Sequence, residues 1–324
     1  MKKKTELFKI LKKGIFFVLP LYLLWVLYIE AMPIYYNRPT NTRWYFLKES
    51  LDGKYKIPEA NKIFLGESRL NAGIDFTKID SAYSFASGGS TPIELYYILK
   101  KYLRNYPKPD TVFLSISPRF FSEIFAFWHF AVRNNLISNA DINEIFSEKE
   151  KQDTVLGSFA EADYYLYKAD YLGYYQDDVL YNYAFAGYKK NKKLIAEMQK
   201  MRGGRPHPGL KDSCSALNYE TNYFDFKPAP LLVNYFSKIL SLCKEKNIKL
   251  IFFSMPMNKS SFKALNPQFI QEYQQFMKKY SKEFPEFDIS DSLYSYPDNC
   301  FGDASHLNSK GKKHFTKQFK RLYH

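Results

Sequence analysis

The sequence contains few cysteines and histidines. Cysteine occurs only three times in 324 residues, at Cys214, Cys243 and Cys300. There is no CxxC pair and no cysteine–histidine spacing typical of ligands, so zinc binding is not expected, and nothing indicates another cofactor. An extracytoplasmic location permits one disulfide, for which Cys214 with Cys300 is a candidate pair. Cys243 lies in an amphipathic pattern typical of a core helix.

Internal repeats and low-complexity linkers are also absent. The apolar share of 46% is enough for a sizeable core, and the length suits one large domain or two small ones. Aromatic residues are abundant, with 28 Tyr and 29 Phe. So many tyrosines cannot all be core residues, and rings with a polar tip suit sugar grooves or a membrane interface.

Only one long run lacks charge, 14-GIFFVLPLYLLWVLYI-29, and six lysines precede it. The positive-inside rule places residues 1–13 in the cytoplasm as a basic tail and the body outside. We expect a single-pass membrane anchor over 14–35 and a membrane-proximal connector over 36–58, with Trp44, Tyr45 and Phe46 at the lipid interface. A cleaved signal peptide is the alternative, but no convincing small-x-small site follows the run.

The formal charge is +14, and it falls to about +9 without residues 1–13, which hold six lysines and Glu6. A basic body favours anionic neighbours, such as lipid headgroups or an acidic envelope polymer. The expected location argues against nucleic acid as the partner.

The body, residues 59–324, alternates short apolar strands with helices, which predicts an α/β fold with a mostly parallel sheet. The strand candidates are 62–66, 82–87, 111–117 and 248–256, and the helix candidates are 92–106, 229–247, 267–284 and 309–324. Residues 120–226 interrupt this pattern. They are rich in Tyr, Phe and Asn and include the turn-prone 202-RGGRPHPG-209, so we interpret them as a mostly helical insertion beside the strand ends.

The first strand candidate runs into 63-IFLGESRLNAGID-75. Ser68 stands at a strand-to-helix turn, where it has two interpretations. It could cap the following helix, since serine is among the best N-cap residues. It could also project its hydroxyl from the sheet edge as a nucleophile.

A second segment, 301-FGDASHLNSKG-311, precedes the closing helix, which Asn308 or Ser309 would cap. Asp303 and His306 are three residues apart, so a carboxylate could orient an imidazole that acts as the base for a serine. The alternative is a turn capped by Asp303 and a histidine on the surface.

These pieces, together with Gly88-Gly89-Ser90-Thr91, resemble the SGNH (GDSL-type) hydrolase superfamily in letters and in order. The resemblance implies a three-layer α/β/α sandwich. It implies Ser68 as nucleophile, His306 as base and Asp303 as orienting acid. It also implies an oxyanion hole formed by the N–H groups of Ser68 and Gly89.

The family's third block normally adds an asparagine to the oxyanion hole, but here it reads 115-SISPRF-120. Arg119 is a candidate substitute or anion-binding residue, with pairing to a nearby acid as the alternative. Arg69, next to Ser68, is a second candidate for substrate support.

With its anchor and altered third block, the chain resembles the DltD-, AlgJ- and AlgX-like partners of membrane-bound O-acyltransferases (MBOATs). That resemblance implies transfer of an acetyl or D-alanyl group to an envelope polysaccharide or teichoic acid, together with a multi-span MBOAT-type acyltransferase. An SGNH esterase or deacetylase and a non-catalytic scaffold or binding protein are the alternatives. The triad alone does not separate transfer from hydrolysis.

Overall fold

The computed structural model describes residues 2–31, 38–124, 127–149, 184–205, 207 and 225–323. Its body is built around a five-stranded sheet with the order β2-β1-β3-β4-β6, in which every pair is parallel. The strands are β1 (Lys62–Gly66), β2 (Ala82–Ser84), β3 (Thr111–Ser115), β4 (Lys249–Phe252) and β6 (Asp288–Ile289). The prediction of a mixed α/β fold with a mostly parallel sheet is therefore confirmed.

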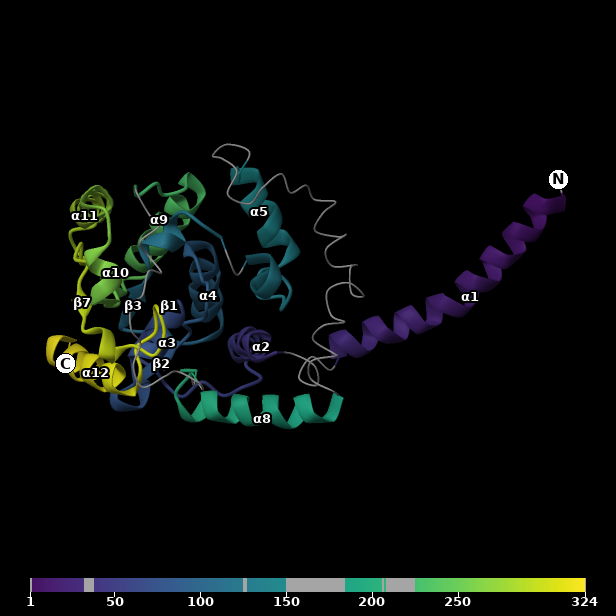
Figure 1. The fold of residues 1–324 in the computed structure, drawn as a ribbon, viewed down its shortest axis with the longest axis horizontal. Coiled ribbons are helices and arrows are strands. Elements are labelled where there is room, and N and C mark those ends of the chain that lie inside the picture. Colours follow the sequence, from purple (N-terminus) through teal and green to yellow (C-terminus); the bar gives the residue numbers. More distant parts are fainter. Residues whose placement is uncertain are drawn as a thin grey trace.

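Apolar side chains on both faces of this sheet are buried, because successive residues of a strand point to opposite sides. Ile63 and Leu65 of β1 belong to one core cluster, whereas Phe64 between them belongs to another. The first cluster includes residues of α4 (Pro92–Asn105), α9 (Pro230–Glu245) and α11 (Pro267–Glu283). The second includes residues of α3 (Ser68–Gly73) and α12 (Ser309–Tyr323). Figure 1 shows these helices around the sheet.

The helix starts follow local sequence signals. Proline opens α4, α9 and α11, where its missing N–H is not needed. Thr91 and Glu94 form a reciprocal capping box at the start of α4. The side chain of Asn308 accepts from the N–H of Gly311, so Asn308 is the cap of α12.

Residues predicted as a membrane-proximal connector instead contain a helix of the body, α2 (Pro39–Leu51). Trp44 is fully buried in the larger core cluster, and Phe46 is buried against Ile195 and Met198 of α8 (Ala184–Lys200). The prediction that these two aromatics rest on a lipid interface was wrong. Aromatic enrichment does not distinguish a membrane interface from a protein core.

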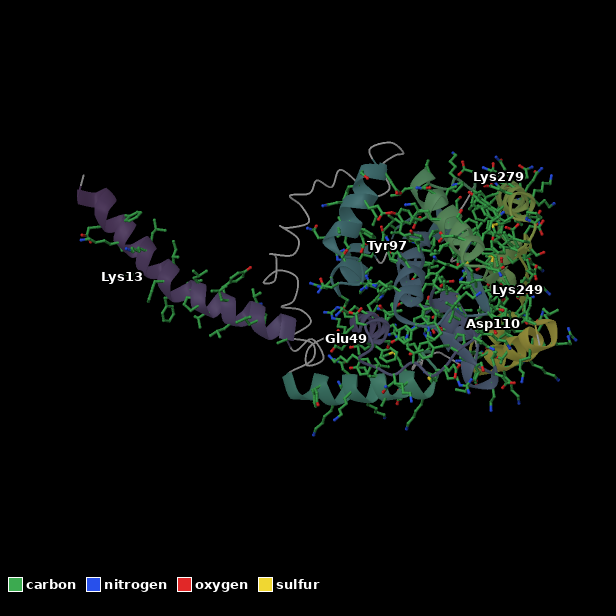
Figure 2. The ribbon with its side chains drawn as sticks, turned by 180° about the vertical axis from the view of Figure 1, so that it is seen from behind. Lys13, Glu49, Tyr97, Asp110, Lys249 and Lys279 are labelled. Carbon is green, nitrogen blue, oxygen red and sulfur yellow. The ribbon has the colours of Figure 1, made fainter. Side chains whose placement is uncertain are left out.

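The N-terminal helix α1 (Lys2–Ala31) contains one candidate membrane span, Phe8–Leu27, by length and composition. Its mean hydropathy is 1.9, and its apolar side chains are exposed, as at Phe16 with 82%. Figures 1 and 2 show α1, with Lys13, extending from the body, whereas side chains such as Tyr97 lie within the body. The helix is long and apolar enough for single-pass anchoring, and the span begins earlier than the predicted residue 14.

The described part of the predicted insertion, residues 120–226, is mostly helical. It contains the second half of η3 (Pro118–Phe121), the π-helix η4 (Phe127–Val132), α5 (Asn139–Lys149) and α8. Smaller elements complete the body: η2 (Phe76–Lys78), α10 (Lys259–Lys263), η5 (Asp298–Cys300), and a two-stranded sheet of β5 (Met257–Asn258) and β7 (Ser295–Tyr296).

Two of the three cysteines lie in the described part of the chain. Cys243 and Cys300 are buried and free. The suggested pairing of Cys300 with Cys214 therefore finds no support, and Cys214 itself lies outside the described residues.

Candidate active site

Ser68 follows the carboxyl end of β1, an inner strand of the sheet between β2 and β3. The chain leaves β1 towards β2 on one side and leaves β3 towards β4 on the other, so the direction of winding reverses between β1 and β3. Ligands of open α/β sheets bind at such switch points. The turn requires Gly66, because a Cβ there would lie 2.5 Å from the carbonyl oxygen of Ser115 and 2.8 Å from Leu70.

The structure brings the three predicted triad residues together. The Nε2 atom of His306 lies 2.8 Å from the Oγ atom of Ser68. On the other side of the ring, Nδ1 lies 2.8 Å from Oδ2 of Asp303 and 3.0 Å from Oδ1. This is the arrangement in which an imidazole held by a carboxylate accepts the proton of a serine nucleophile.

The Asp303 carboxylate is held by its own turn. The backbone N–H groups of Ser305 and His306 donate to its Oδ1 atom at 2.9 and 2.8 Å. Partial burial alone would raise the pKa of Asp303, but the hydrogen bonds from His306 and Ser305 outweigh it and hold the pKa at about 2. Asp303 therefore both caps a turn and orients the histidine, so the two interpretations of this segment are compatible.

The Gly88-Gly89 turn lies against Ser68, since a Cβ built on Gly88 would be 3.7 Å from the Cβ of Ser68. Gly89 has a φ of +77°, a conformation that favours glycine. Its N–H donates to no described residue. The turn leads into α4 through the Thr91 capping box.

Glu67 is a buried residue of the site that the sequence reasoning did not single out. It is 2% exposed, and its Oε2 atom accepts from the N–H of Arg69 at 2.8 Å and lies 3.2 Å from Ser68 Oγ. Glu67 is thus the N-cap of α3, and Ser68 is the first helical residue. The interpretation of Ser68 as the cap was wrong, because the Glu67 carboxylate next to it takes that role. The Ser68 hydroxyl contacts Glu67 at 3.2 Å and, more closely, His306 at 2.8 Å.

The altered third block supports Glu67. Ser117 follows β3, and its hydroxyl donates to Oε1 of Glu67 at 2.8 Å. In 115-SISPRF-120 it is therefore Ser117 that reaches the site, through the carboxylate. Arg119 pairs with Glu123 at 2.9 Å, which matches the alternative of a nearby acidic partner. Arg69 is buried, with 6% exposed. Roles for Arg119 and Arg69 towards a substrate stay predictions.

A second histidine, His207, packs on the triad. Its ring lies 5.3 Å from that of His306, centroid to centroid, with 29° between the planes. The turn-prone composition of 202-RGGRPHPG-209 was the only sequence signal for this segment. No spacing rule links it to Asp303 or His306.

The described residues contain no group of histidine, cysteine and carboxylate side chains that could hold a metal ion. The site is thus an arrangement of a serine, two histidines and two carboxylates at a sheet switch point. No protein-family model matches the chain, and no curated protein matches it by sequence.

Proposed function

We propose that the protein is a serine-dependent acyl-transfer enzyme with an SGNH-like three-layer α/β/α body, anchored to the membrane by α1. The observation that carries the proposal is the continuous chain of contacts from Ser68 through His306 to Asp303, at 2.8 Å in each step. These residues come from opposite ends of the sequence, and random surface residues do not form such a chain with the correct ring nitrogens.

The proposed chemistry has two steps. His306 takes the proton of Ser68 as the hydroxyl oxygen attacks the carbonyl carbon of an acyl donor, and the donor's leaving group departs with that proton to give an acyl-serine. In the second step His306 takes the proton of an acceptor hydroxyl as its oxygen attacks the acyl-serine, and returns that proton to Ser68 Oγ when the ester bond to Ser68 breaks. Backbone N–H groups of Ser68 and Gly89 would stabilise the oxyanion in both steps, and one such donor is worth about 3 kcal/mol in known acyl-transfer sites.

The acceptor that fits best is a hydroxyl of an envelope polysaccharide or teichoic acid, and the donor-supplying partner is an MBOAT-type membrane enzyme. Support comes from α1, which would keep the site near a membrane partner, and from the basic body, which favours an acidic polymer. The acyl group is acetyl or D-alanyl in this proposal. The cytoplasmic placement of residues 1–13 and the extracytoplasmic placement of the body belong to it as well.

An esterase or deacetylase is the second candidate, because hydrolysis uses the same triad with water as acceptor. The half-buried position of Ser68 leaves its hydroxyl reachable from solvent. A non-catalytic binding protein is a third candidate, because the third block lacks the asparagine that normally contributes to the oxyanion hole.

Ser68→Ala and His306→Ala test the proposal. Each is expected to abolish acyl turnover on the envelope polymer, a loss of about 10⁴-fold or more, while the protein still folds. His314→Ala is the matched control, because His314 lies on α12 and packs on Tyr296 away from the triad. Unchanged polymer acylation in both triad variants would favour the scaffold.

Deletion of the gene separates the two enzymatic candidates. Loss of acyl groups from the envelope polymer identifies a transferase, whereas a gain identifies an esterase. Mass measurement of the isolated polymer also gives the identity of the acyl group.

A further inference from the structure

Residues 201–205 and His207 form a strap that leads from the end of α8 to the triad. The strap runs along β2, the edge strand, where the N–H of Ser84 donates to the carbonyl of Arg202 at 2.9 Å. The guanidinium of Arg202 donates to the carbonyl of Ile79, also at 2.9 Å. These bonds fix the backbone that carries His207.

Two glycines let the strap approach the sheet. Gly203 has a φ of +78°, and a Cβ there would lie 2.2 Å from the carbonyl oxygen of Ser84 and 2.7 Å from the ring of Tyr83. At Gly204 a Cβ would lie 3.0 Å from Phe76. Larger residues would push the strap away from β2 and His207 away from His306.

His207 lies near the cationic side chains of Arg205 and Lys312 and is itself held neutral. Burial lowers its pKa most, and the neighbouring His306, Arg205 and Lys312 lower it further, to about 3, against a raising contribution from Asp303. These groups come from the strap, from the 303–306 loop and from α12. At neutral pH an uncharged aromatic ring therefore faces the catalytic histidine.

The hydrogen bonds of His306 to Asp303 and Ser68 are made by its two ring nitrogens, at the edge of the ring. The His207 ring instead packs on His306 in a stacked arrangement, so it adds a contact with a ring face that neither hydrogen bond supplies. An uncharged aromatic face also attracts a cation, and the imidazole of His306 becomes a cation whenever it holds the proton of Ser68.

We propose that His207 is a positioning residue of the active site: its neutral ring sets the plane of His306 and stabilises the imidazolium that forms during acyl transfer. This inference rests on the proposed function of the Ser68 site. It assigns a role to the strap, a segment of the insertion that is not needed to form the triad itself.

The test compares three substitutions in the full chain in detergent micelles, with p-nitrophenyl acetate as the acyl donor. His207→Ala is expected to lower the acylation rate roughly 5- to 30-fold, in line with the value of a desolvated cation–aromatic contact. His207→Phe, which restores a flat aromatic face, should recover most of that loss. His207→Lys should cost about 100-fold or more, because two like charges would face each other when His306 is protonated.

The pH–rate profile distinguishes positioning from general damage. In His207→Lys the acid limb of the profile should move to lower pH, since the added charge disfavours protonation of His306. Loss of packing alone would lower the plateau rate and leave the acid limb of the profile at the same pH. His314→Lys, on the exposed side of α12, is the control and should leave the profile unchanged.

Equal rates and equal acid limbs for His207→Lys and His207→Phe would overturn the inference, provided that both variants unfold thermally at similar temperatures. A second measurement does not depend on turnover. The His306 ring resonances in NMR should titrate at lower pH in His207→Lys than in His207→Phe, and coincident titrations would also overturn it. Absence of ester turnover above Ser68→Ala in the unmodified protein would instead contradict the proposed function.

Discussion

Two segments hold His306, and they are built differently. The 303–306 loop is local: its carboxylate, its histidine and the two N–H groups that bind the carboxylate lie within four residues. The strap of residues 201–205 and His207 is non-local, since His207 contacts His306 across the sequence and two glycines allow the backbone to approach β2. The local loop relies on hydrogen bonds to a charge, and the strap relies on packing. Substitutions in the loop and substitutions in the strap should therefore have different kinds of effect.

Asp303→Asn breaks the local segment and has the largest expected effect. Turnover should fall roughly 10³- to 10⁴-fold, because an amide cannot stabilise the imidazolium and favours the wrong tautomer. Steady-state kinetics with an acetyl ester measure this loss. Asp298→Asn is the control: Asp298 accepts from Ser260 in a similar turn carboxylate interaction, outside the triad. Comparable losses in the two variants would contradict a specific role for Asp303.

Gly203→Ala breaks the strap, and Gly53→Ala is its matched control. Both glycines have positive φ, +78° and +86°, but only Gly203 has backbone and ring atoms where the Cβ would go. Gly53→Ala should lower the free energy of unfolding by about 1 kcal/mol, the cost of a left-handed alanine. Gly203→Ala should cost roughly 3 kcal/mol or more, since the added Cβ also clashes with β2. Urea unfolding measures both, and equal losses would show that the strap is free to move off the edge strand.

Glu94 belongs to a second local segment, the capping box at the start of α4, which follows the Gly88-Gly89 turn. Its carboxylate binds the N–H and hydroxyl of Thr91, while burial raises its pKa to about 7 despite those bonds. The folded state thus favours the protonated carboxyl. The stability that this contributes is fully present below the ordinary pKa of 4.5 and is lost as the pH rises through about 7.

Glu94→Gln isolates the effect of titrating this carboxyl, because glutamine also completes a capping box but does not titrate. Between pH 5 and pH 8 the unmodified protein should lose on the order of 2–3 kcal/mol more unfolding free energy than Glu94→Gln. Urea midpoints at the two pH values test this. Glu245→Gln, on an exposed carboxylate, should behave like the unmodified protein. If Glu94→Gln shows the same pH dependence as the unmodified protein, Glu94 is not its source.

Much of the fold followed from local patterns. Apolar runs marked β1, β3 and β4, although β3 ends at Ser115 rather than at residue 117 and β4 is Lys249–Phe252 rather than 248–256. The helical patterns marked α4, α9 and α11 close to their observed bounds. The second strand is shorter than predicted, Ala82–Ser84 rather than 82–87. The two-residue strand β6 has too few residues to show a pattern, and α2 resembles a membrane-proximal segment until its aromatics are seen to be buried.

The sequence by itself determined the local half of the site. The glycine-serine turn after the first strand and the Asp303–His306 spacing are short-range features, in which few bonds separate the interacting groups. The N-cap of α3 is a local contact too, although the spacing alone did not identify Glu67 rather than Ser68 as the cap. Only the tertiary structure decided that Ser117 supports Glu67 and that His207 packs on His306. Those contacts join segments far apart in the chain, and their partners are chosen by packing against the sheet, which no local spacing encodes.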